Sequence, residues 1–523
     1  MKQLEIPAFG EERVYENREN RDCRVFLIPE AEETLFDAYS RRLIDGGCIK
    51  REEYRLDAHR FAAFAGDNGE GVFLNYYGAT RELNIVTETN CRYFSYCDEF
   101  RGELTQPQIT QIMLEDFGFS YAVRLSDGRF IVFDGGRNFE PDQDRLYQCL
   151  KEGSPDQTPI IAAWVMTHPH SDHFHCFLGF MDRYGDRVKI ERFLLNFPDA
   201  DDLAHYPKLA HKDPRFEDSS GCTNVPRMWE RIDRSGAEVY TVHTGQRYRI
   251  GDAACEILSC MDDTIHCSQN INATSVVIRM ELGEQIILWA ADASFSDARI
   301  PERYGTHLKA DILQVPHHGF QCGTAEAEIR GYQLIRPKVC LLPVSDYNAF
   351  TFFCTHKEGA HYLMTRADVD EIITGTVQRT LTLPYTAPAY AKHELQRQYL
   401  SGRDNCGVCT WIYSELSTSC PEDFQFTLLN TANRAATVWI DLFFEDPKER
   451  ILFIKAEVGA ARLKRIDVSG ADVDRNALYF NWMSGNKPQQ IPSDVPFAVR
   501  FISDTPIVVS HRSHTASYHG ENR

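Results

Sequence analysis

The chain of 523 residues has no apolar run close to the roughly 20 residues that a membrane-spanning helix needs. Its first residues, MKQLEIPAFGEERVYENREN, lack the apolar stretch of a secretory leader. The 16 cysteines are scattered from Cys23 to Cys420 without the spacing of a disulfide framework. We therefore expect a cytoplasmic protein that has reduced cysteines and no membrane partner.

The chain also has fewer basic than acidic residues. The chain has 56 Lys and Arg residues against 76 Asp and Glu residues, a formal net charge of −20. Such a balance opposes binding to phosphate backbones and anionic membranes, so nucleic acid is disfavoured as a partner. The sequence also lacks a GxSxG motif, a P-loop and a dinucleotide-binding fingerprint.

The remaining composition, 43% hydrophobic and 25% charged, is that of a soluble globular protein too long for one ordinary domain. Residues 1–105 contain a helix pattern at 31–47 and a hairpin pattern, which predict an N-terminal α/β segment. Residues 106–388 alternate strand and helix patterns, with a hairpin turn at "SDG", residues 126–128. Residues 389–405 are polar and irregular, as in a linker, and residues 406–523 have strand patterns throughout.

The stretch THPHSDH, directly after the apolar run IIAAWVM, concentrates metal-binding side chains. His168 and His170 would point to one side of an extended backbone, and a turn at residues 169–171 would return Asp172 and His173 towards them. Imidazole and carboxylate together suit zinc, with manganese or iron as alternatives. His175 lies outside the pattern, and we interpret it as structural.

These residues resemble the signature of the metallo-β-lactamase fold superfamily, and further stretches follow in that superfamily's order. FIVFDGG resembles its early strand that ends in an Asp, here Asp134. QIILWAADA resembles the strand that delivers a bridging carboxylate, here Asp292, and ADILQVPHHGF the strand that ends in a His, here His317 or His318. NATSVVIRMELGEQIILWAADA and RPKVCLLPVSDYN are most similar to the hydrolase domain of bacterial DNA-uptake channel proteins. The expected fold is therefore α/β, with an αββα sandwich over 106–388.

The resemblance implies two divalent metal ions, and Zn²⁺ is the expected metal at both positions. His168, His170 and a third His would hold one ion, and Asp292 would bridge the two. Asp172, His173 and either His317 or His318 would hold the other, and Asp134 would orient a ligand. For the third His the sequence offers His205, His211, His243 and His266, of which His266 has the best position. Asp172, His317 and His318 are the predicted catalytic residues, since the non-ligand member of the HHG pair would donate a proton or orient the substrate.

The function that this resemblance implies is dinuclear metal-dependent hydrolysis through a bridging hydroxide. A phosphoester, either a small molecule or glycan-linked, is the expected substrate, because its non-bridging oxygens can span two cations. This predicts a phosphodiesterase-like enzyme. Two alternatives are a nuclease acting on DNA or RNA and a non-catalytic, metal-stabilised scaffold or sensor.

The C-terminal part shows a second resemblance. LLNTANRAATVWIDLFFEDPKE and SDTPIVVSHRSHT are similar to the sensory rhodopsin transducer-like family, whose members are small cytoplasmic β-sandwiches that tend to form oligomers. The resemblance implies a β-sandwich over 406–523, homo-oligomer formation through it, and a carbohydrate-like ligand contacted by His511, Arg512 and His514. The alternative for these three residues is an exposed polar strand end.

Overall fold

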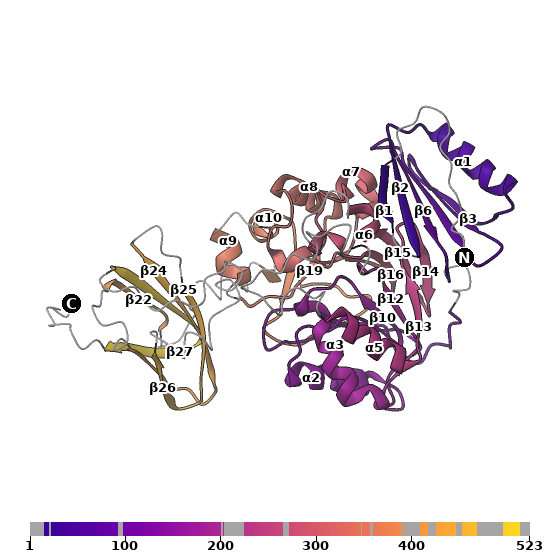
Figure 1. Cartoon of the computed structure of the whole chain (residues 1–523). Coiled ribbons are helices and arrows are strands. Elements are labelled where there is room, and N and C mark those ends of the chain that lie inside the picture. The colour runs from indigo at the N-terminus through magenta and orange to yellow at the C-terminus, as the bar shows by residue number, and fades with distance from the viewer. Residues whose placement is uncertain are drawn as a thin grey trace. The chain divides into compact units, whose positions relative to one another are not determined.

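The computed structural model describes residues 15–19, 22–92, 98–199, 202, 224–264, 271–346, 348–355, 359–388, 391–392, 408–416, 425–445, 452–467 and 495–512. The chain divides into two compact units, Met1–Ala391 and Lys392–Arg523, each described by itself below (Figure 1). Within the described ranges, no helix is both long enough and apolar enough to cross a membrane.

The first unit begins with an antiparallel sheet of order β1-β2-β6-β5-β4-β3. Helix α1 (Glu33–Asp45) covers one face of it and buries Phe36, Tyr39 and Leu43, which recur at helical spacing. The helix predicted at 31–47 is confirmed, and it ends at the Gly46–Gly47 pair, where Gly47 has φ +95°. The strands are β1 (Tyr15–Glu19), β2 (Cys23–Pro29), β3 (Ile49–Leu56), β4 (His59–Ala65), β5 (Gly71–Tyr77) and β6 (Glu82–Glu88).

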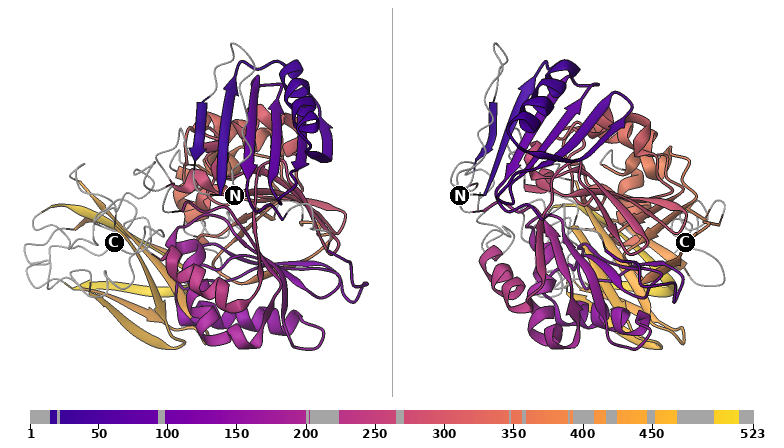
Figure 2. Two further views of the ribbon diagram at one scale, coloured as in Figure 1. Left: turned by 45° about the vertical axis from the view of Figure 1, so that its right-hand side comes forward. Right: turned by 90° about the vertical axis from the view of Figure 1, so that its right-hand side faces the viewer.

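The strands β4, β5 and β6 of this sheet are buried on both faces, whereas the edge strand β3 is largely exposed. Alternate residues such as Phe26 and Leu74 pack under α1, whereas Val25, Phe73 and Val86 join the large core of the following sandwich. Both views of Figure 2 show the sheet lying against the rest of the first unit. The N-terminal segment and the sandwich therefore share one continuous core.

The sandwich consists of two sheets. The eight-stranded sheet has the order β13-β12-β10-β9-β8-β7-β21, with β11 paired to β10, and the seven-stranded sheet has the order β14-β15-β16-β17-β18-β19-β20. The strands of the first are β7 (Gln108–Gln111), β8 (Ser120–Arg124), β9 (Phe130–Asp134), β10 (Ile160–Met166), β11 (Lys189–Ile190), β12 (Arg192–Leu195), β13 (Glu238–Thr241) and β21 (Arg379–Thr382). Those of the second are β14 (Arg247–Ile250), β15 (Ala253–Ser259), β16 (Val277–Leu282), β17 (Gln285–Trp289), β18 (Ile312–Gln314), β19 (Val339–Leu342) and β20 (Glu371–Thr374).

Apolar residues fill the space between the two sheets, where Trp289 stacks on Phe133 with ring centroids 4.3 Å apart. Helices α2 (Glu140–Gly153), α3 (Ser171–Tyr184) and α5 (Val225–Ser235) pack on the outer face of the first sheet around Trp164. On the other side lie α7 (Ile300–Tyr304), α8 (Ala325–Ile335) and α10 (His361–Thr365) (Figure 1). The layers are helix, sheet, sheet, helix, and the predicted αββα sandwich is confirmed. Short helical segments are η2 (Gly185–Arg187), α6 (Met261–Thr264), η4 (Ile271–Thr274), η5 (Gly305–Leu308), η6 (Pro316–Gly319), η7 (Asn348–Phe352) and α9 (Phe353–Thr355).

Parallel pairing brings the ends of neighbouring strands together. β9 and β10 are parallel, as are β17 and β18, so each pair delivers the residues that follow it to one edge of its sheet. Gln314 ties the second pair together, because its side-chain oxygen accepts hydrogen bonds from the N–H groups of Ala290 and Ala291 at 2.9 and 2.6 Å. The segments 134–136, 167–173, 290–292 and 315–318 therefore begin at fixed positions.

The second unit consists of strands in the part that the structure describes. Its sheet has the order β25-β24-β27-β23-β26, with β22 paired to β27. The 16-residue β27 pairs with β24 through its first half and with β23 through its second, so one sheet curls around the core and nearly closes. The all-strand prediction is confirmed. The strands are β22 (Val408–Leu416), β23 (Gln425–Asn430), β24 (Ala436–Phe444), β25 (Leu452–Val458), β26 (Arg462–Asp467) and β27 (Phe497–Arg512).

Candidate metal centre

Two groups of side chains with metal-ligand chemistry lie at the strand ends described above. The first is His168, His170 and Asp292, and the second is Asp172, His173 and His318. In each group, one ligand atom per residue lies within 4.8 Å of the others. Of the six side chains, only His170 is not fully buried, so this histidine marks the side of the centre nearest solvent.

Asp292 faces both groups. Its Oδ2 lies 3.8 Å from His168 Nε2 and 3.5 Å from His318 Nε2, and its Oδ1 lies 3.2 Å from His173 Nε2. Its backbone N–H is anchored by Ser275 Oγ at 3.2 Å. Oδ2 thus faces a histidine of each group and Oδ1 faces His173 of the second, so the carboxylate is placed as a bridging ligand would be.

The spacing within the groups also suits metal ions. Nitrogen and oxygen ligands bound tetrahedrally at about 2.0–2.1 Å from one zinc ion lie about 3.3 Å from one another. His168 Nε2 lies 3.1 Å from His170 Nδ1, and His318 Nε2 lies 3.2 Å from Asp172 Oδ2. The donor atoms thus converge at the separation that a shared ion requires, and the imidazole and carboxylate set fits divalent transition metals.

Asp134 orients one of these histidines. One of its carboxylate oxygens accepts the Thr167 backbone N–H at 2.8 Å. The other accepts the Thr167 hydroxyl at 2.5 Å and His173 Nδ1 at 2.7 Å. Asp134 thus favours a proton on His173 Nδ1 and leaves Nε2 facing the centre. Burial would lower the pKa of this histidine, but the carboxylates of Asp292 and Asp134 raise it well above its ordinary value. Phe119 stacks on the same imidazole at 5.1 Å and fixes the plane of its ring.

The protonation of the centre follows from burial and neighbouring charge. Burial lowers the pKa of His168 well below its ordinary value and lowers that of His170 to about 4. Burial would also lower the pKa of His318, but the carboxylates of Asp292 and Asp172 raise it to about 9. Burial would raise the pKa of Asp172, but His318, His173 and Arg137 hold it well below its ordinary range. Two anionic carboxylates at the centre thus attract positive charge, which a metal ion would supply.

The two histidines of the HHG pair have different surroundings. His318 belongs to the second group, whereas His317 belongs to neither. His317 Nε2 accepts a hydrogen bond from Asn272 Nδ2 at 2.9 Å, and its Nδ1 lies 3.1 Å from the Phe320 carbonyl. Both ring nitrogens of His317 are therefore occupied by the chain, and its pKa is lowered by burial. His318 is the member placed to bind metal.

Backbone strain collects at this edge. Asp134, Ala291, His317 and His318 all have positive φ angles between +45° and +53°. A left-handed conformation costs a non-glycine residue on the order of 1 kcal/mol, and such residues concentrate at functional sites. Bonds such as His317 N–H to the Ala291 carbonyl, at 2.9 Å, hold these turns in place.

Other residues predicted from the sequence lie elsewhere. His266, His205 and His211 are outside the described residues, so the third ligand of the first group stays a prediction. His243 belongs to a different buried group, with Cys23 and Asp262. His175 Nε2 is hydrogen-bonded to Asn224 at 3.1 Å, away from both groups.

The structure adds residues that the motifs did not indicate. Arg137, immediately after the DGG stretch, lies over the Phe117 ring at 4.7 Å, and its Nη1 reaches Ser171 Oγ at 3.5 Å. Phe117 in turn contacts the His318 ring at 5.3 Å. The signal for Arg137 was its position next to Asp134, while Phe117 and Asn272 carried no pattern of their own.

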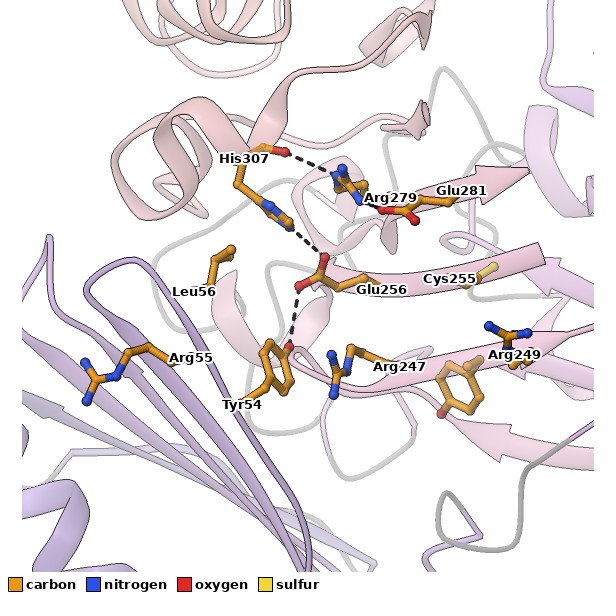
Figure 3. Close-up of a pocket in the computed structure, with 12 residues that line it drawn as sticks. Tyr54, Arg55, Leu56, Arg247, Arg249, Cys255, Glu256, Arg279, Glu281 and His307 are labelled. Carbon is orange, nitrogen blue, oxygen red and sulfur yellow. Dashed lines mark hydrogen bonds and ion pairs between the residues drawn. The ribbon is translucent and has the colours of Figure 1, made fainter. Parts of the chain in front are cut away.

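A cavity of about 480 Å³ lies at a different place, between β3 and strands β14–β16 (Figure 3). At its centre Glu256 is bonded to His307 at 2.7 Å and to the Tyr54 hydroxyl at 3.5 Å. None of the candidate metal ligands lines it. Its size therefore carries no information about the metal centre.

Comparison with known proteins gives one family and several distant structures. The model of the Anabaena sensory rhodopsin transducer family matches residues 418–519. The structure of the Anabaena sensory rhodopsin transducer is similar with 23% identity and a TM-score of 0.17, covering 21% of this chain and 87% of that chain. No curated protein sequence matches the chain.

Two solved structures resemble about half of the chain. CmlA, a diiron β-hydroxylase from Streptomyces venezuelae, is 12% identical with a TM-score of 0.35, over 54% of this chain and 55% of that chain. The short form of human tRNase Z is 12% identical with a TM-score of 0.29, over 53% of this chain and 99% of that chain. Because these TM-scores are low, the fold assignment rests on the sheet order and the layers described above. The family match to residues 418–519 lies in the part of the chain where the sequence showed the same resemblance.

Proposed function

We propose that the protein is a dinuclear metal-dependent hydrolase that acts on a phosphoester. The observation that carries the proposal is the position of Asp292, whose two oxygens face His168 of one group and His173 of the other at 3.8 and 3.2 Å. His168, His170 and Asp292 would hold one ion, and Asp172, His173, His318 and Asp292 the other. Such ions, when bound, acidify water and neutralise charge on the oxygens of a substrate.

The side chains of the chain itself prepare the centre. Asp134 keeps the His173 proton on Nδ1, so that Nε2 stays a donor to metal. Burial lowers the pKa of His317, and Asn272 and the Phe320 carbonyl fix its ring, so His317 would position the turn that carries His318. Phe117 and Phe119 shield the imidazoles of His318 and His173 from water on one side.

Arg137 supports an anionic substrate. Its guanidinium acts electrostatically on Asp172 and is held over Phe117 beside Ser171, at the beginning of α3. Its Nε also forms an ion pair with Asp116 at 3.3 Å, and the planar donors of a guanidinium are well suited to the non-bridging oxygens of a phosphoryl group. A phosphoester is therefore favoured over an uncharged ester or amide.

The proposal is tested by metal content and turnover together. The zinc-loaded and manganese-loaded full chain is assayed against phosphomonoesters, phosphodiesters, single-stranded DNA and a β-lactam. We expect phosphoester turnover that Asp292→Ala abolishes together with bound metal. The control His175→Gln, in α3 and outside both metal groups, should retain both. Turnover of DNA alone would identify the protein as a nuclease and would exclude a small phosphoester as its substrate. Full metal content and turnover in Asp292→Ala would refute the proposed site.

A further inference from the structure

A third group of metal-ligand side chains lies outside the candidate metal centre. Cys23, His243 and Asp262 are all buried, and one ligand atom of each lies within 4.8 Å of the others. Cys23 begins β2 of the N-terminal sheet, His243 follows β13, and Asp262 lies in α6. Three segments far apart in the chain thus converge where the N-terminal sheet meets the sandwich.

Two carboxylates flank the imidazole of His243. His243 Nδ1 lies 2.5 Å from Asp262 Oδ2, and its Nε2 lies 3.1 Å from Glu88 Oε2 at the end of β6. Asp262 Oδ2 also accepts hydrogen bonds from Asn196 Nδ2 at 3.2 Å and from the Cys260 thiol at 3.3 Å. Phe73 packs against the ring at 5.2 Å, which keeps the group away from solvent. Buried carboxylates are costly unless a cation compensates them.

We propose that this group is a structural zinc site that fastens the N-terminal sheet to the sandwich. Cys23 Sγ, His243 Nδ1 and an Asp262 oxygen supply three ligands. Cys260, whose Sγ lies 3.3 Å from Asp262 Oδ2, is adjacent to these three ligands but does not belong to the group. Glu88 accepts the Nε2 proton and orients the imidazole, the role that carboxylates have beside zinc-binding histidines. Thiolate and imidazole together select zinc over magnesium or calcium.

Zinc binding would require a change in the distance between His243 and Asp262. Ligands of one tetrahedral zinc ion lie about 3.3 Å apart, so the Asp262 carboxylate must withdraw from His243 by about 1 Å. The Glu88 contact need not move. The neighbouring bonds Asn75 Nδ2 to the Thr244 carbonyl, 2.7 Å, and Asn84 Nδ2 to Asp263 Oδ1, 3.3 Å, already join the same two parts of the unit. All three ligands are buried and Phe73 packs against the imidazole, which closes the site to a substrate, so the site is structural and not catalytic.

Cobalt distinguishes this site from the candidate metal centre, because the latter contains no cysteine among its proposed ligands. The full chain, reduced and freed of metal, is titrated with Co²⁺ and followed by absorption spectroscopy. We expect a thiolate-to-cobalt charge-transfer band in the near ultraviolet that Cys23→Ser and Asp262→Asn remove or weaken strongly. The matched control is Cys48→Ser, a buried cysteine packed under α1 and outside the group. His170→Ala, which changes only the candidate metal centre, should retain the band.

Zinc content provides the second measurement. As purified, Cys23→Ser should contain one zinc ion fewer per chain than the wild-type protein and Cys48→Ser. If the band persists unchanged in Cys23→Ser, it arises from other thiols among the 16 cysteines, and the proposal is overturned. A zinc X-ray absorption spectrum of the wild-type protein without a sulfur shell would overturn it without any variant. In that case the group is a hydrogen-bonded charge cluster alone.

Discussion

Replacing Asp134 by Asn should weaken metal binding by Asp172, His173 and His318 without unfolding the protein. Asp134 Oδ1 accepts the Thr167 N–H at 2.8 Å, and an Asn oxygen can keep that bond. The Asn amide group, however, would present its N–H to His173 Nδ1, where the carboxylate now accepts at 2.7 Å. His173 would then carry its proton on Nε2, which prevents coordination. Asn also tolerates the positive φ of +49° at this position, so the change adds no backbone strain.

The expected loss of metal affinity follows from other metal sites in which a carboxylate orients a histidine ligand. Loss of the group that orients a metal-binding histidine lowers metal affinity by about 10–100-fold, or about 1.4–2.7 kcal/mol. Competition with a chelator, or isothermal titration calorimetry with Zn²⁺, measures the change, and circular dichroism verifies the fold. Asp142→Asn, another buried Asp but outside both metal groups, is the control. Affinity in folded Asp134→Asn within about twofold of the wild type would refute the orienting role, because the expected loss is about 10-fold at least.

Three further predictions concern substrate binding, pH and domain independence. Arg137→Gln should lower kcat/KM for a phosphodiester by about 10–100-fold through loss of charge-assisted hydrogen bonds, while metal content is unchanged. A kcat/KM equal to that of the wild-type protein would exclude Arg137 from substrate binding. Burial raises the pKa of Asp142 to about 7, above its unfolded value near 3.8. Because the folded state holds this proton more tightly, the contribution of Asp142 to the free energy of unfolding should fall as pH rises from about 4 to about 7. Chemical denaturation should show Asp142→Asn more stable than wild type at pH 8 by on the order of 2 kcal/mol and similar at pH 4, with exposed Asp144→Asn as control. Residues 1–391 alone should fold and retain metal and turnover, because every described candidate ligand lies in that compact unit; loss of turnover in the folded, metal-replete fragment would show that the C-terminal unit takes part in the reaction.

The sequence predicted the part of the site that is local. His168, His170, Asp172 and His173 follow one apolar strand within a few residues, so a strand end and one turn suffice to bring them together. The alternating strand patterns and the hairpin turn at residues 126–128 likewise depend on short-range chemistry. The αββα layers followed from the resemblance and from the alternation of strands and helices.

The rest depends on tertiary packing. The choice between His317 and His318 is decided by two successive left-handed residues and by the bond from Asn272, none of which leaves a pattern in the sequence. Phe119 approaches His173 only because β8 lies beside β9. Cys23, His243 and Asp262 come from three distant segments, so no spacing rule could have joined them.

The most direct measurement is a crystal structure of the zinc-loaded protein with anomalous scattering at the zinc edge. We expect two peaks about 3.5–4 Å apart at the strand ends, with Asp292 between them. One should lie within bonding distance of His168 and His170, and the other within bonding distance of Asp172, His173 and His318. A single peak there, or none, would contradict the dinuclear centre on which the proposed function depends.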